Sequence, residues 1–87
     1  MKKLVSVQEV SGEGLEALLG EQVILMCVNY NYSGKLVGVN DKCVLLENAF
    51  IIYETGEWSA KSWKDAQKVG DTWYVSTASI ESYGLGK

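Results

Sequence analysis

The chain has 87 residues, a net charge of −3 and a hydrophobic fraction of 47%, which predicts one small folded domain rather than a disordered chain. Its longest apolar run, residues 23–28, is too short to span a membrane. Gln8 and Glu9 interrupt any signal-like segment after Lys2 and Lys3, so we expect a cytoplasmic protein with no membrane partner. The acidic balance also argues against a duplex-DNA partner.

The chain contains no histidine, proline or arginine. Without histidine, a Ser-His-Asp triad, a Cys-His pair and a His-containing metal site are excluded. Cys27 and Cys43 follow no CxxC pattern, and their strand-like surroundings favour small buried side chains over a disulfide or a reactive thiol. We therefore expect no enzyme, no metal site and no cofactor.

The sequence of the N-terminal part predicts an extended arm followed by a short helix. Residues 1–10 alternate weakly between apolar and polar, which indicates an extended arm. Ser11 is a good helix N-cap, and apolar side chains follow at helical spacing, at Leu15, Leu18 and Leu19. Gly20 can end a helix in the left-handed conformation. We predict a helix over residues 12–19 that lays its leucines on a sheet.

The sequence pattern over residues 21–54 predicts three strands. The predicted strands cover residues 21–30, 32–39 and 43–54, with turn-forming residues between them. Both faces of the first strand are apolar, so we expect both to be covered. Gly34 and Gly38 lie inside the second strand, where glycine indicates a bulge or a tight bend of a small barrel.

The C-terminal part predicts a long loop and a closing hairpin. Trp58 and Trp63 lie in the polar loop at residues 55–71; they are either local packing anchors or a stacking surface for bases or a partner protein. The hairpin at residues 72–84 holds no lysine and a single acid, Glu81. Open edge strands usually carry such blocking charges. We therefore expect this edge to pair with another copy, a contact that forms a ring when it closes.

A helix followed by five strands, with LxGxxV at the first strand and YxGxLxGxN/D leading into the third, resembles the Sm-like (LSm/Hfq) family. The matching residues are Leu18, Gly20, Val23, Tyr32, Gly34, Leu36, Gly38, Asn40 or Asp41, Leu46 and Ala49. The match covers residues 12–50, and the final hairpin matches only in layout. The resemblance implies a mainly β fold, with an N-terminal helix on a strongly bent five-stranded open barrel of SH3 type. It also implies rings that pair the fourth strand of one subunit with the fifth of the next.

Members of the family bind U-rich single-stranded RNA around the pore. The resemblance implies RNA contacts from two turns, formed by Asn40, Asp41, Lys42, Cys43, Ser76 and Thr77. It implies an oligomer interface on the hairpin, at Trp73, Tyr74, Val75, Ile80 and Tyr83. The family's stacking residue falls here on Asp41 or Lys42, its base-reading Asn on Cys43 or Val44, and its Arg-Gly on Ser76-Thr77, so the chain resembles a divergent branch.

We predict a homo-oligomeric ring that binds single-stranded RNA, as an RNA chaperone or a component of a ribonucleoprotein. The alternative is a ring-shaped protein-interaction scaffold without significant RNA binding, with Trp58 and Trp63 as its partner loop. The loss of the usual pocket and the acidic balance favour that alternative. Lys42 is open to interpretation as an ordinary solvated lysine, and Asn40 and Asp41 as turn formers alone.

Overall fold

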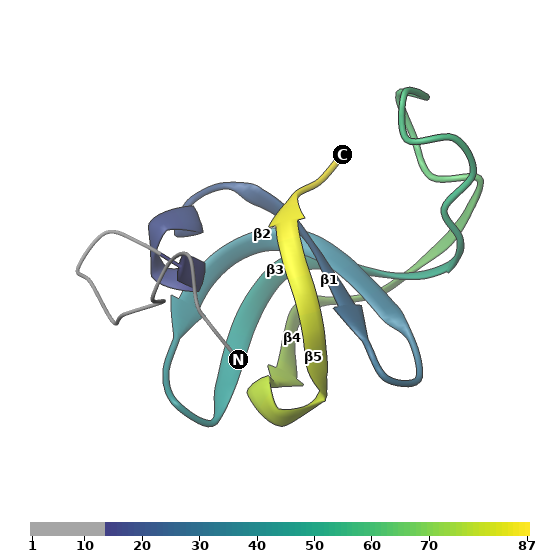
Figure 1. Cartoon of the computed structure of the whole chain (residues 1–87). Coiled ribbons are helices and arrows are strands. Elements are labelled where there is room, and N and C mark those ends of the chain that lie inside the picture. Colours follow the sequence, from purple (N-terminus) through teal and green to yellow (C-terminus); the bar gives the residue numbers. More distant parts are fainter. Residues whose placement is uncertain (1–13) are drawn as a thin grey trace, which may run out of the picture.

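The computed structural model describes residues 14–87, which form one five-stranded antiparallel sheet and two 3-10 helices (Figure 1). The elements in chain order are η1 (Gly14–Leu18), β1 (Gln22–Cys27), β2 (Asn31–Val39), β3 (Cys43–Glu54), β4 (Asp65–Ser76), η2 (Thr77–Ser79) and β5 (Ile80–Leu85). The strands lie in the order β4-β3-β2-β1-β5. The predicted mainly β fold is therefore confirmed, and β4 and β5 occupy the two edges of the sheet.

The short link between β4 and β5 requires the sheet to curve. Four strand spacings separate the two edges, about 19 Å in a flat sheet. Only η2, at Thr77–Ser79, connects the end of β4 to the start of β5, and a 3-10 segment rises only about 2 Å per residue. The edges therefore approach each other at this end, and Figure 1 shows the strands curving accordingly.

The curved sheet packs its strands around a single hydrophobic core. Its buried apolar side chains come from β1, β2, β3 and β4: Val23, Leu25, Leu36, Val44, Leu46, Ala49 and Val75. Ile24 is also only 4% exposed, so both faces are covered in the first half of β1, as predicted. The strand is shorter than predicted because it ends at Cys27, and Val28 is 65% exposed.

Both predicted glycine irregularities in β2 coincide with shifts in strand register. The pairing of β2 with β3 shifts between Ser33 and Lys35 and again between Leu36 and Gly38. At Gly34 a Cβ atom would lie 3.1 Å from both the Glu47 carbonyl oxygen and the Leu46 Cβ. This close approach of the two backbones explains why the position requires glycine.

The predicted helix differs from the observed one. Its first two residues, the arm and Ser11 lie outside the described residues. From Gly14 to Leu18 the chain forms a 3-10 helix, in which residues three apart share a face. Leu15 and Leu18 accordingly pack against the core, whereas Leu19 is 47% exposed. Gly20 has a φ of 88°, the left-handed conformation predicted for it.

The predicted loop at residues 55–71 is too long. Strand β4 begins at Asp65 and pairs with β3 as far as Glu54, so the loop covers residues 55–64. The predicted closing hairpin is wrong, because β4 begins at Asp65 rather than at residue 72 and lies on the opposite edge of the sheet from β5. The polar sequence from Asp65 to Asp71 gives no strand signal of its own. It forms a strand because the outer edge of the long strand β3 supplies hydrogen-bond partners, which outweigh local propensity.

Within residues 14–87 the structure contains no helix that is both long and apolar enough to cross a membrane.

Candidate functional site

The turn between β2 and β3 is held by the side chain of Asn40. Its Oδ1 accepts hydrogen bonds from the backbone N–H groups of Lys42 and Cys43, both at 2.8 Å. The Asn40 N–H donates to the carbonyl oxygen of Cys43 at 3.0 Å. The amide oxygen of Asn40 therefore shapes the turn, as Asn commonly does, and only its NH₂ group is left to contact a ligand.

Two hydrogen bonds connect a second turn, which follows β4, to the turn between β2 and β3. The Thr77 N–H donates to the Lys42 carbonyl oxygen, and the Thr77 hydroxyl donates to the Asp41 carbonyl oxygen, both at 2.9 Å. Cys43 and Ser76 are paired across β3 and β4. The structure thus brings together all six residues predicted to contact RNA. We call them the turn cluster: Asn40, Asp41, Lys42, Cys43, Ser76 and Thr77.

The turn cluster is a polar surface with one cation. Residues 40–42 and Ser76 are exposed, and Cys43 and Thr77 are half-buried. Lys42 supplies an ammonium group and Asp41 a carboxylate, whereas none of the six side chains is aromatic. Such a surface can contact phosphate and sugar groups and the edge of a base, but it provides no ring on which a base could stack.

The predicted interface residues all lie on the two edge strands, but they differ in exposure. Tyr74 of β4 is 68% exposed and Tyr83 of β5 is 44% exposed, and Trp73 is exposed as well. Ile80 is half-buried and packs against the core. Val75 is only 4% exposed and packs in the core of its own chain. Its side chain is therefore not available to another copy, because alternate residues of a strand face opposite sides.

The two loop tryptophans contact each other. The ring centroids of Trp58 and Trp63 lie 5.3 Å apart with an angle of 89° between the planes, a T-shaped pair. The loop closes on itself through the Lys64 N–H, which donates to the Thr55 carbonyl oxygen at 3.2 Å. This geometry agrees with the interpretation of the tryptophans as local packing anchors, although Trp58 remains 56% exposed.

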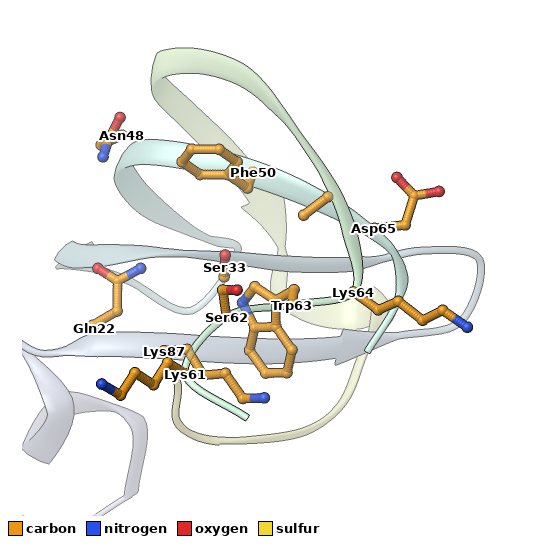
Figure 2. A pocket seen from close by; sticks show the side chains of 11 residues that line it. Gln22, Ser33, Asn48, Phe50, Lys61, Ser62, Trp63, Lys64, Asp65 and Lys87 are labelled. Atoms are coloured by element: carbon orange, nitrogen blue, oxygen red, sulfur yellow. The ribbon is translucent and has the colours of Figure 1, made fainter. Parts of the chain in front are cut away.

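A cavity of about 490 Å³ separates this loop from the sheet (Figure 2). The strands contribute Gln22, Ser33, Asn48 and Phe50 to its wall. The other side is formed by the loop residues Lys61, Trp63 and Lys64 together with Lys87. This cavity was not predicted, because its residues are scattered along the chain. The sequence does show Asn48 as a polar interruption of an apolar strand, and in the structure this residue has a φ of 52°, a conformation in which Asn is enriched.

Both cysteines are free and half-buried, which agrees with their predicted role as small packed side chains. Burial raises the pKa of the Cys27 thiol above 9.0, and the carboxylate of Glu81 adds to the increase, although a hydrogen bond with Ser79 opposes it. A thiol with a raised pKa is a poor nucleophile at neutral pH, because the thiolate is the reactive form.

Comparisons of the chain with protein-family models, with curated proteins and with solved structures gave no match. The Sm-like resemblance of the sequence therefore stays a prediction. The structure establishes a five-stranded antiparallel sheet with β4 and β5 on its edges and a polar turn cluster beside the end of β4.

Proposed function

We propose that the chain assembles through β4 and β5 into a homo-oligomeric Sm-like ring and binds single-stranded RNA at the turn cluster. The observation that carries the proposal is that, within residues 14–87, the sheet has two different edge strands whose outer sides pair with no other strand, with apolar side chains exposed on both. An edge strand whose backbone groups are unpaired is a template for another strand. When β4 of one copy pairs with β5 of the next, the contact is heterologous, and its closure gives a ring.

The charges along β4 limit where such pairing occurs. Its first half carries Asp65, Lys68 and Asp71, of which the last two form an ion pair at 2.7 Å. The second half, residues 72–76, carries no charge and exposes Trp73 and Tyr74. Charged edges oppose strand addition, so the contact uses residues 72–76 of β4 and the facing part of β5.

The RNA part of the proposal rests on the turn cluster. Because Thr77 is hydrogen-bonded to the first turn, both turns form one surface directly after residues 72–76 of β4. A ring repeats this surface once per subunit, so the ammonium groups of Lys42 recur along the path of a bound strand. A row of cations neutralises successive phosphates, although each one alone contributes little.

The test is the affinity for a fluorescein-labelled oligouridine, measured by fluorescence anisotropy for the wild type and for Lys42→Glu. We expect Lys42→Glu to lower the affinity by about tenfold or more, because it replaces a phosphate-binding cation with a repelling carboxylate in every subunit. Lys35→Glu is the matched control, since Lys35 is also exposed but lies in the middle of β2. Equal losses in both variants would contradict binding at the turn cluster.

One observation supports a second candidate function, a ring that serves as a protein-interaction scaffold. Trp58 is 56% exposed at the tip of the loop, and exposed tryptophans are enriched in protein interfaces. The same experiment separates the two candidates. A closed oligomer that does not bind oligouridine favours the scaffold, whereas a loss of RNA binding in Lys42→Glu favours the RNA-binding ring.

A further inference from the structure

The cavity beneath the 55–64 loop is separate from the turn cluster. Figure 1 shows this loop projecting from one end of the sheet, whereas η2 and the turn between β2 and β3 lie at the opposite end. The cavity wall contains none of the six residues of the turn cluster. A ligand in the cavity would therefore contact a different set of side chains from RNA bound at the turn cluster.

The charges around the cavity favour an anion. Three lysines line it against a single acid, Asp65, although the chain as a whole carries a net charge of −3. Lys64 forms an ion pair with Glu54 at 3.4 Å. Within the described residues Lys61 has no ion-pair partner, so its charge is available to a ligand.

Lys87 lines the cavity and is held there by two contacts. Its ammonium group donates to the Glu57 carbonyl oxygen at 2.8 Å and lies 4.5 Å from the centroid of the Trp63 ring. An ammonium group has three donors, so Lys87 retains hydrogen atoms for a further acceptor. Together with Lys61 it provides two cations for one anionic group.

The indole N–H group of Trp63 is a donor in the cavity wall that requires an acceptor. This Nε1–H group is buried and has no acceptor within the described residues, whereas buried donors in folded proteins are nearly always satisfied. Figure 2 shows this nitrogen on the edge of the ring directed toward Ser33 and Ser62. A ligand that carries an acceptor and lies between the loop and β2 would satisfy it.

The remaining wall residues suit a flat, polar ring. Phe50 and Trp63 supply aromatic surface, and the side-chain amides of Gln22 and Asn48 each offer a donor and an acceptor. Aromatic faces that stack a base and amides that read its edge are the usual means of recognising an unpaired nucleotide. The volume of about 490 Å³ lies within the usual range for small-ligand sites.

We propose that this cavity binds a nucleotide, with its phosphate at Lys61 and Lys87 and its base beside Phe50 and Trp63. The ligand is either a free nucleoside monophosphate or one nucleotide of a single strand, because both present the same groups. The site goes beyond the proposed RNA-binding function, since its lining residues are distinct from the turn cluster.

The test follows the indole N–H signals of ¹⁵N-labelled protein by NMR during titration with uridine and adenosine monophosphates. The chain has three tryptophans, and Trp58→Phe and Trp73→Phe, at two accessible positions, identify the Trp63 signal by elimination. We expect a saturable shift of the Trp63 signal and, in Lys61→Gln, an affinity about tenfold lower, as fits the loss of one charge-assisted hydrogen bond. Lys61 is exposed in the loop, so this variant keeps its fold.

Parallel titrations distinguish the sources of the ligand and the two sites. A Trp63 shift with the monophosphates assigns a free nucleotide, and a shift with oligouridine alone assigns a nucleotide within a strand. Lys42→Gln is expected to weaken oligouridine binding at the turn cluster but to leave the Trp63 shift in place. The proposal is overturned if no nucleotide or oligouridine moves the Trp63 signal, if Lys61→Gln binds as tightly as the wild type, or if inorganic phosphate alone reproduces the entire shift.

Discussion

Tyr74→Lys tests whether the outer edge of β4 is a subunit interface. Tyr74 is the most exposed of the large apolar residues of the described chain, at 68%. A tyrosine side chain offers about 200 Å², so about 140 Å² of it is available for burial. At about 25 cal/mol per Å², burial of this area contributes about 3 kcal/mol to each contact between subunits, and the lysine would remove that contribution and add a charge to the edge.

A loss of about 3 kcal/mol weakens each contact more than about a hundredfold. We therefore expect Tyr74→Lys to dissociate at concentrations where the wild type is a single closed oligomer, as measured by native mass spectrometry and sedimentation. The thermal unfolding of the isolated subunit should change little, because Tyr74 makes no part of the core.

Tyr53→Lys provides the matched control. Tyr53 is 53% exposed but lies on β3, which has β2 and β4 on its two sides and therefore no open edge. This variant should assemble like the wild type. Pairing of subunits through β4 is refuted if the wild type is a monomer, or if Tyr74→Lys and Tyr53→Lys form the same oligomer with the same stability.

Two further predictions concern the stability of the subunit. Asn40→Ala removes the acceptor for the N–H groups of Lys42 and Cys43. It should lower the free energy of unfolding, measured by urea titration, by about 1 kcal/mol, as the loss of a comparable capping oxygen does. Asn40→Asp keeps an acceptor and should recover most of that loss. The raised pKa of Cys27 means that, as the pH rises through 9.0, the unfolded chain loses its thiol proton before the folded chain does, so stability falls. Between pH 8 and pH 10 the unfolding midpoint of Cys27→Ala should therefore fall less than that of the wild type, and equal falls would show that Cys27 makes no such contribution.

The sheet was predictable where local signals and tertiary structure agree. Strand β3 has the predicted bounds, because its long apolar run ends at clear turn formers on one side and in the loop on the other. The register shifts at Gly34 and Gly38 follow from the same logic, since an isolated glycine in a strand indicates an irregularity. These features depend on neighbouring residues, which a single sequence displays directly.

The errors arise where a distant segment decides the structure. The first half of β4 contains Asp65, Lys68 and Asp71, yet it is a strand because it pairs with β3. The cavity wall combines Gln22, Phe50 and Lys61, residues from three separate parts of the chain, and no spacing rule connects them. By contrast, the turn cluster was predictable, because the resemblance to a known family placed two distant turns in one site.

The two proposed sites should respond differently to assembly. Ser76 ends the uncharged half of β4 and Thr77 follows it, so the turn cluster lies beside the proposed subunit contact, and a bound strand would pass from one subunit to the next. The cavity lies at the other end of the sheet, and the residues of β4 that line it, Asp65 and Ala66, are at the opposite end of that strand from residues 72–76. Tyr74→Lys should therefore weaken RNA binding because it separates the subunits, whereas nucleotide binding near Trp63 should persist in the dissociated monomer. Loss of both together would mean that the cavity depends on the neighbouring subunit, contrary to its distance from residues 72–76 of β4.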